Sequence, residues 1–390
     1  MSIGSVLRRC RVEAGLSVAA AAALGQVSRS GLSMVEAGRR SPNPAVLARL
    51  TRALGVQPDV WVPVYLQGEP RCQRLVDVAR VLVEAGEYEA ARLVLSRAFF
   101  MSRHTGDGRH NADIYQLLGR VRLALGHYGR ALRWFKLFER AVRHGSDERM
   151  QAIATFNVAL CMGQVGQEFE AAARFSEVIK QFGRQQLKRE LGWAWLAKAN
   201  VLLKRRSHKE AQQAYRSAAH YLRGQEFHGD AMLGLAITSH ALEGAEASMP
   251  LYRKLLRRYP NNHLLCAKAR VNLAVALRDL GLFEDAVREV DTALTDRAML
   301  PTSLVASLLT EAALLRALGR DFASAIYALA EYKNLVGERD GQDIAVMRIL
   351  AQALGTVPPQ EELPGIVGDE HEHRLKDALG ILYGEVAGDG

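Results

Sequence analysis

A pattern of about 40 residues recurs through most of this chain. Each copy has an apolar helical pattern, a turn and a second helical pattern, as in Leu-Gly-His-Tyr-Gly-Arg-Ala at 125–131 and Leu-Gly-Leu-Phe-Glu-Asp-Ala at 280–286. A small residue near the start of each second helix falls 37 to 40 residues after the previous one, at Ala91, Ala131, Ala171, Ala211, Ser248, Ala286 and Ala325. Seven copies at so even a period predict a solenoid of helical hairpins, in which neighbouring copies bury one continuous core.

Residue size around these positions supports the hairpins. A large apolar residue follows four positions after each small one, at Leu95, Phe135, Phe175, Tyr215, Tyr252, Val290 and Leu329. In six copies a Gly or Ala also lies twelve positions before the small residue of the second helix, at Gly119, Ala159, Ala199, Ala236, Ala274 and Ala313. The small residues would let the two helices of a hairpin approach closely, and the large ones would fill the seam between hairpins.

This pattern resembles the tetratricopeptide repeat. Pro260 ends one second helix, as in that family. The family's usual length is 34 residues, so each copy here has an excess of about six residues, or about 1.7 helical turns. The resemblance therefore implies longer helices and a deeper groove than usual.

The first 62 residues have a different organisation, of five short helices. The apolar spacing and end signals predict helices over 3–14, 18–24, 29–37 and 44–54, then a short helical turn from Pro58 that carries Trp61. Ser17, Ser28 and Asn43 are each placed to cap a helix. The second and third helices, joined by a tight turn, predict a helix-turn-helix motif.

Positive charge is concentrated in the same segment. Residues 1–62 hold eight Arg and three acidic residues, which gives +5 of the chain's formal charge of +9. A basic protein suits an acidic partner, which could be nucleic acid, a membrane surface or an anionic ligand. Because the excess coincides with the helix-turn-helix and the loop after it, the sequence favours double-stranded DNA as a partner.

The run GLSVAAAAALGQVSRSGLSMVEAGRRSPNPAVLARLTRALGV resembles the lambda-repressor-like, or Xre-type, DNA-binding domain. The resemblance implies that the third helix enters the major groove by its N-terminal end. It assigns base contacts to Arg29, Ser30 and Met34, a close backbone approach to Gly31, and phosphate contacts to Ser28, Arg39 and Arg40. The open alternatives are a solvated basic face and a domain that binds protein.

Two positions depart from that family. Val18 stands where the family usually has a DNA-contacting Gln, and Gln26 stands where it usually has Gly. We therefore expect one customary contact to be missing and the turn to differ slightly. Glu36 is expected to be structural, packing against a neighbouring helix or pairing with an arginine.

The first helices of the hairpins are expected to line a concave surface. Matching registers places there a candidate peptide or partner site formed by Gln116, Arg120, Asn157, Trp193, Asn200, Lys204, Lys268, Asn272 and Arg278. Mid-helix Asn is a poor helix former, but its amide can both donate to and accept from a peptide backbone. The mixture of amides and cations suits a short extended peptide with an acidic side chain or a free carboxylate. The alternative is that each Asn is simply exposed or bonds locally.

Other chemistry has little support in the sequence. Cys10, Cys72, Cys161 and Cys266 are too far apart for a metal or disulfide motif, so we expect reduced thiols in a cytoplasmic protein. No uncharged apolar run is long enough for a membrane span, and no catalytic constellation is evident. The acidic and histidine-rich run at 369–373 is expected to begin a final helix rather than hold a metal. We expect no enzyme activity, no cofactor and no metal.

Together the two parts resemble the RRNPP-type regulators, intracellular receptors of Gram-positive bacteria and phages that bind short signalling peptides. The expected fold is all-α: a five-helix helix-turn-helix domain over 1–66, a right-handed solenoid of about seven tetratricopeptide-like hairpins over 70–356, and a C-terminal segment over 357–390. The resemblance implies a homodimeric, quorum-sensing type of transcription regulator whose repeats bind a peptide or protein effector that modulates operator binding. The alternative is an adaptor whose repeats dock a protein partner while the helix-turn-helix only localises it.

Overall fold

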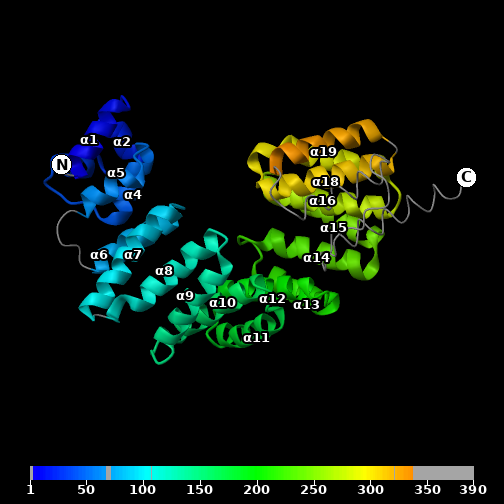
Figure 1. Ribbon diagram of the computed structural model, residues 1–390, viewed down its shortest axis with the longest axis horizontal. Helices are drawn as coiled ribbons and strands as arrows, with labels where there is room; N and C mark the ends of the chain where they lie inside the picture. The colour runs from blue at the N-terminus through cyan, green and yellow to red at the C-terminus, as the bar shows by residue number, and fades with distance from the viewer. Residues whose placement is uncertain (1–2, 67–71, 107, 320, 337–390) are drawn as a thin grey trace, which may run out of the picture. The chain divides into compact units, whose positions relative to one another are not determined.

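The described part of the chain is built from helices alone. The computed structural model describes residues 3–66, 72–106, 108–319 and 321–336, in which there is no strand (Figure 1). The first five helices are α1 (Ile3–Glu13), α2 (Val18–Leu24), α3 (Arg29–Glu36), α4 (Pro44–Ala53) and α5 (Pro58–Tyr65). The expected all-α fold is confirmed, and the predicted ends of the first four helices agree with the structure to within one residue.

The remaining helices form seven hairpins. They are α6 (Cys72–Glu84) with α7 (Tyr88–Thr105), α8 (Asn111–Ala124) with α9 (Tyr128–Val142), α10 (Glu148–Gln164) with α11 (Glu168–Arg184), α12 (Lys188–Lys204) with α13 (His208–Tyr221), α14 (His228–Glu243) with α15 (Ala245–Arg258), α16 (His263–Asp279) with α17 (Phe283–Thr295), and α18 (Thr302–Leu318) with α19 (Phe322–Val336). Short 3-10 turns at Gly108–His110 and Arg297–Met299 precede α8 and α18. The number of hairpins and their places are those predicted from the repeat.

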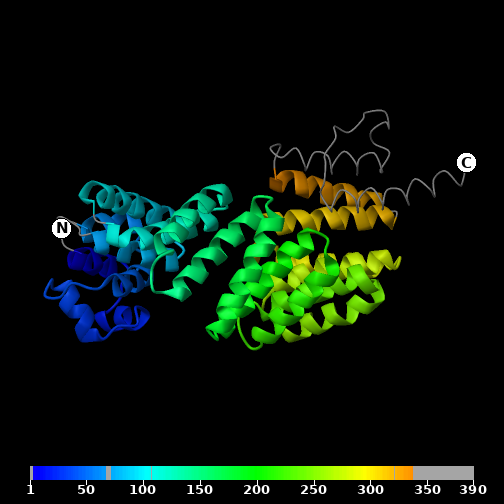
Figure 2. The same ribbon diagram turned by 90° about the horizontal axis from the view of Figure 1, so that it is seen from below.

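The chain divides into two compact units. Unit 1 spans Met1–Leu187 and contains α1 to α11, and unit 2 spans Lys188–Gly390 and contains α12 to α19. Successive hairpins pack against each other within unit 1, α7 on α8 and α9 on α10 (Figure 1). Within unit 2 the first helices α12, α14, α16 and α18 contact one another in chain order, and α18 and α19 lie side by side (Figure 2).

The repeat register is confirmed by burial. All seven small residues are fully buried, from Ala91 in α7 to Ala325 in α19. The large residues four positions later are also buried, with Tyr215 at 2% and Leu329 at 7% exposed as the most accessible. At Gly119 an added Cβ would lie 2.5 Å from the Phe135 ring, so α8 and α9 approach closely because this position has no side chain.

The helix-turn-helix and the first hairpins share one hydrophobic core. Leu7, Leu32 and Trp61 belong to the same buried cluster as Leu75 and Leu95. Two backbone contacts join the same parts, since Arg74 donates to the Tyr65 carbonyl oxygen at 2.8 Å and Arg52 to the Ala85 carbonyl oxygen at 3.3 Å. The apolar core therefore continues from α5 into α6.

The described part of the chain has no helix with the length and apolarity needed to cross a bilayer. The four cysteines are free thiols in this structure. Burial raises the pKa of the Cys161 thiol to about 12, so this thiol is protonated and unreactive at neutral pH. The predicted final helix and the acidic and histidine-rich run at 369–373 lie outside the described residues.

Candidate functional site

Helix α3 has one exposed face and one buried face. Leu32 and Val35 are buried in the core, whereas the side chains of Arg29, Ser30 and Met34 are exposed. This arrangement follows from helical spacing, because positions three apart lie on one side of the helix. The three residues to which sequence analysis assigned base contacts therefore share the accessible side of α3.

The start of α3 is held by its cap. The Ser28 hydroxyl accepts a hydrogen bond from the Gly31 amide at 3.0 Å and lies 3.3 Å from the Ser30 hydroxyl. A Cβ at Gly31 would lie 2.8 Å from the Ser28 hydroxyl oxygen. Gly31 thus has a local role in making room for the cap, beside the close approach to DNA that sequence analysis assigned to it.

In the turn before α3, Gln26 has a backbone conformation that is usual for glycine. Gln26 has a φ of 52°, in the left-handed region that glycine favours. Gln26 thus adopts the backbone conformation that a glycine would readily take at this position. The chain accepts a cost of about 1–2 kcal/mol for an L-residue in this conformation.

A buried ion pair attaches the end of α3 to α1. Arg11 Nε donates to Glu36 Oε1 at 2.7 Å and Arg11 Nη2 donates to Glu36 Oε2 at 2.8 Å. Arg11 Nη1 also donates to the Leu16 carbonyl oxygen at 2.9 Å. The two side chains are only 11% and 7% exposed, and the hydrogen bonds to Glu36 raise the pKa of Arg11. The structural role predicted for Glu36 is confirmed.

The basic residues of the candidate DNA surface have exposed side chains. Arg29 begins α3, and Arg39 and Arg40 follow its end. Among the described residues, none of these three arginines makes an ion pair. Each is therefore available to a phosphate or a base edge, and these positive charges are not balanced by a neighbouring carboxylate.

The candidate effector residues all lie on first helices of hairpins, but in both units. Gln116 and Arg120 lie on α8 and Asn157 on α10, in unit 1. In unit 2, α12 carries Trp193, Asn200 and Lys204, and α16 carries Lys268 and Asn272, with Arg278 in its last turn. The candidates of unit 2 lie on first helices that belong to one stack, in which α12 contacts α14 and α14 contacts α16.

Several candidates in unit 2 have partners within the fold. The Tyr215 hydroxyl donates to Asn200 Oδ1 at 2.7 Å, and Asn272 Nδ2 donates to the Lys268 carbonyl oxygen at 2.8 Å. The local bond of Asn272 is the alternative that sequence analysis left open. Lys268 Nζ lies 3.8 Å from Asp230 Oδ1 with both side chains about 40% exposed, so this pair leaves the lysine accessible.

Arg278 and Trp193 are more enclosed. Arg278 Nη1 donates to Glu311 Oε1 at 2.6 Å, and these side chains are 9% and 4% exposed, so the arginine connects α16 to α18. The Arg189 guanidinium lies 4.7 Å from the centre of a Trp193 ring, whose Nε1 is buried without a hydrogen-bond partner in the described part of the chain. Sequence analysis placed Arg278 on the candidate surface but did not predict that it pairs with a carboxylate of the next hairpin.

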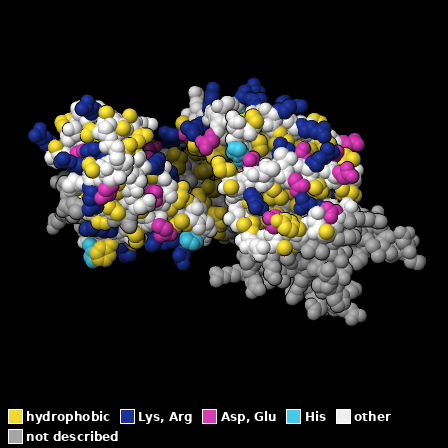
Figure 3. All heavy atoms as spheres, turned by 90° about the horizontal axis from the view of Figure 1, so that it is seen from above, with side chains coloured by type: hydrophobic (Ala, Val, Ile, Leu, Met, Phe, Trp, Pro, Cys, Tyr) yellow, Lys and Arg dark blue, Asp and Glu magenta, His cyan; other side chains and the backbone are white. Residues whose placement is uncertain are grey.

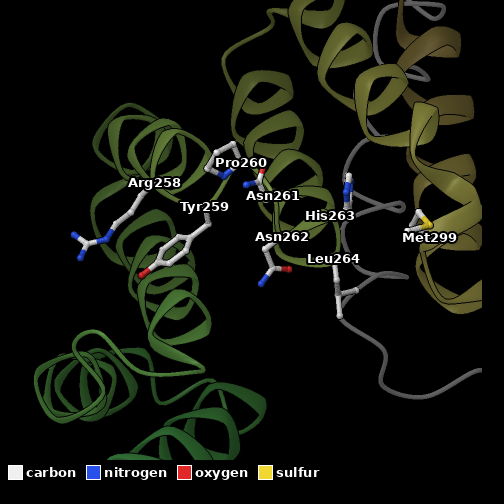
Figure 4. A pocket seen from close by; sticks show the side chains of 8 residues that line it. All are labelled: Arg258, Tyr259, Pro260, Asn261, Asn262, His263, Leu264 and Met299. Atoms are coloured by element: carbon white, nitrogen blue, oxygen red, sulfur yellow. The ribbon is translucent and has the colours of Figure 1, made fainter. Parts of the chain in front are cut away.

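A cavity of about 580 Å³ lies where α15 ends and α16 begins. Figure 4 shows Arg258 and Tyr259 extending from the end of α15, and Asn262, His263 and Leu264 from the start of α16. Pro260, Asn261 and Met299 complete its lining. The Asn262 side chain caps α16 by accepting from the Leu265 amide at 3.0 Å, so one polar group of this cavity is already used by the fold.

Comparison with known proteins identifies the two parts of the chain. Residues 2–61 match a family described as helix-turn-helix domain. The quorum sensor NprR from B. thuringiensis in its apo form is similar in structure, with a TM-score of 0.61 and 12% identity, over 81% of this chain and 96% of NprR. Comparison with curated proteins gives no match.

Two further solved structures share the fold. The apo form of RapI aligns with a TM-score of 0.55 and 12% identity, over 71% of this chain and 97% of RapI. A tetratricopeptide repeat protein from Parabacteroides merdae aligns with a TM-score of 0.54 and 15% identity, over 72% of this chain and 98% of that protein. The chain thus combines an N-terminal helix-turn-helix domain with tetratricopeptide-like repeats, the architecture expected from its resemblance to RRNPP-type regulators.

Proposed function

We propose that this protein is a DNA-binding transcription regulator whose repeats bind a peptide or protein effector that modulates operator binding. The observation that carries the proposal is the accessible face of α3 within a segment that matches a helix-turn-helix family. On this face Arg29 reads bases, and in the loop after α3 Arg39 and Arg40 hold phosphates. One small domain makes few contacts, so the regulator acts as a homodimer on a two-fold symmetric site.

The effector part of the proposal has separate support. The repeats share their fold with NprR, which is a quorum sensor. Lys268 and Asn272 lie one helical turn apart on α16, so both can reach one extended ligand on the stack of first helices. An effector changes DNA binding only if it binds one arrangement of the dimer better than another.

The DNA contacts are tested by separating specific from general binding. Arg29→Ala is expected to weaken binding to an operator by about 1–3 kcal/mol with little change for random DNA, because it removes a contact to a base. Arg39→Ala is expected to weaken both alike, because a phosphate contact is independent of sequence. Genome-wide mapping of the bound DNA supplies the operator, and fluorescence anisotropy with operator and random fragments measures both affinities.

The control for that experiment is Arg92→Ala, which removes an arginine paired with Glu89 on α7, outside the helix-turn-helix. It should leave both affinities unchanged. If Arg29→Ala weakens binding to operator and random DNA equally, the base-reading role of Arg29 is wrong. If no sites are enriched in the genome-wide map, the regulator proposal itself fails.

The effector site is tested with a library of short synthetic peptides that includes acidic members. We expect at least one peptide to shift the operator affinity of the unmodified protein, and the Lys268→Ala/Asn272→Ala variant to lose that shift while keeping its DNA affinity. The matched control is Lys209→Ala/Gln213→Ala on the exposed side of α13. A response that survives in the α16 variant would contradict this site, and loss in both variants would show an effect of charge alone.

A further inference from the structure

Four cationic side chains converge on a pocket in unit 2 that the proposed function does not use. The pocket has a volume of about 390 Å³ and lies between α13, α14 and α15. Its polar lining consists of Arg216, His220, Arg223, His228, Lys254 and Arg258, and it includes no acidic residue. We refer to it as the cationic pocket.

The chain itself does not neutralise these charges. Among the described residues, none of the four cations forms an ion pair; Arg216 donates only to the Gln212 side-chain oxygen, at 2.9 Å. Glu226 and Asp230, which flank His228 in sequence, lie close to other cations, since Glu226 is 3.9 Å from Arg189 and Asp230 is 3.8 Å from Lys268. Like charges that share a site repel one another, so a bound anion would stabilise this arrangement.

This concentration of charge is local. On the face drawn in Figure 3, Lys and Arg side chains are interspersed with Asp and Glu side chains. Elsewhere in the repeats arginines face carboxylates, as Arg174 faces Glu139 at 2.6 Å and Arg316 faces Asp291 at 2.7 Å. A pocket with four cations and no carboxylate therefore differs from these arginine–carboxylate pairs elsewhere in the repeats.

His228 forms the buried side of the pocket, and its pKa depends in part on the same positive charges. His228 is 6% exposed, and its Nδ1 is hydrogen-bonded to the Tyr259 hydroxyl. Burial, and then the positive charges of Arg258 and Arg223, lower the pKa of His228, so the ring is neutral at pH 7. A neutral ring beside exposed guanidinium groups gives the pocket a less polar inner wall, against which a ligand can pack.

We propose that the cationic pocket binds a small phosphorylated ligand, whose phosphate group is held mainly by Arg223, Lys254 and Arg258. Guanidinium groups bind phosphate oxygens through paired, charge-assisted hydrogen bonds, and a phosphate offers more charge and acceptors than one carboxylate. The volume is in the range of pockets that enclose small molecules, and its concave lining suits a compact ligand. The pocket belongs to unit 2 and shares no residue with the candidate DNA surface of unit 1, so this inference is independent of the DNA-binding proposal.

The test is isothermal titration calorimetry of the full chain at about 0.15 M salt, where exposed charges are screened, with pyrophosphate, a nucleoside diphosphate and a sugar phosphate. We expect at least one of these probes to bind, and Arg223→Gln/Arg258→Gln to weaken its affinity at least about tenfold, because two charge-assisted contacts are removed. Hydrogen exchange of α13 to α15 should slow when that probe binds to the unmodified protein and not when it is added to the double variant.

The matched control is Arg253→Gln/Arg257→Gln, which removes the same charge from α15 at two exposed positions that do not line the pocket. This control should bind the probe within about twofold of the unmodified protein, since neither arginine lines the pocket and salt weakens the attraction of an exposed charge outside it. Equal weakening in both double variants would overturn the pocket in favour of general surface charge. Failure of all three probes to bind, or binding only to vesicles of anionic phospholipid, would also overturn it.

Discussion

Replacing Glu36 with alanine is expected to destabilise the helix-turn-helix domain by about 3–5 kcal/mol. The substitution leaves Arg11 as an uncompensated charge in a site where only 11% of its side chain is exposed. It also removes both hydrogen bonds that join the end of α3 to α1. Hydrogen exchange of α1 to α5 in the full chain measures this effect, because it reports the opening free energy of each segment separately.

Two further variants separate the buried pair from an ordinary surface charge. Glu13→Ala removes the exposed partner of Arg9, 3.9 Å away, and is expected to change the opening free energy by less than about 1 kcal/mol. Arg11→Met/Glu36→Leu removes both buried charges and should regain most of the lost stability. A Glu36→Ala variant as stable as Glu13→Ala would show that the pair does not anchor α3.

Glu36 also distinguishes positioning from direct contact with DNA. Its carboxylate is occupied by Arg11, so it cannot contact phosphate or base edges while the pair is intact. Loss of operator binding in Glu36→Ala would therefore accompany faster hydrogen exchange in α3. Loss in Arg29→Ala should occur with unchanged exchange, because the Arg29 side chain is exposed.

The predictable parts of the fold were those set by local rules and by the repeat. Ser17, Ser28 and Asn43 cap α2, α3 and α4 as expected, because a cap depends on residues only three positions apart. The seven hairpins followed from small and large residues at fixed offsets, since the same seam recurs in each copy. These features need no knowledge of how distant segments meet.

The partners of the candidate groove residues were harder to predict. The sequence around a mid-helix Asn does not show which partner its side chain has. Asn200 accepts a hydrogen bond from Tyr215 and Asn272 donates to its own helix, but the same pattern would also fit an Asn that faces a ligand. A signal for the ion pairs was nevertheless present: Lys268 and Asp230 are 38 residues apart, and Arg278 and Glu311 are 33 apart. Opposite charges separated by about one repeat are expected to meet on neighbouring hairpins.

The cationic pocket was missed for a related reason. Its cations come from α13, the turn after it and α15, and they are separated by up to 42 residues, from Arg216 to Arg258. The net charge of the chain outside the helix-turn-helix is small and gave no sign of a local excess. Such a site depends on which charges have no partner, and this follows only from the packing of α13, α14 and α15.

Replacing Leu95 with alanine is expected to destabilise the first hairpins by about 2–5 kcal/mol. Leu95 is fully buried at the position where each repeat has its large seam residue, and truncation would leave a cavity between helices that cannot fully close. Because Leu95 belongs to the same core cluster as Leu75 and Trp61, faster hydrogen exchange should extend from α7 into α6 and α5. This spread would show that the helix-turn-helix domain depends on the repeats for part of its stability.

The control for this prediction lies two residues away on the same helix. Leu93 is 62% exposed, so Leu93→Ala makes the same chemical change without creating a cavity and should alter the opening free energy by less than about 0.5 kcal/mol. Because alanine is the better helix former at both positions, helix propensity cannot explain a difference between the variants. Equal effects at Leu93 and Leu95 would contradict the repeat register. An effect of Leu95→Ala confined to α7 would instead contradict the continuous core between the helix-turn-helix and the first hairpin.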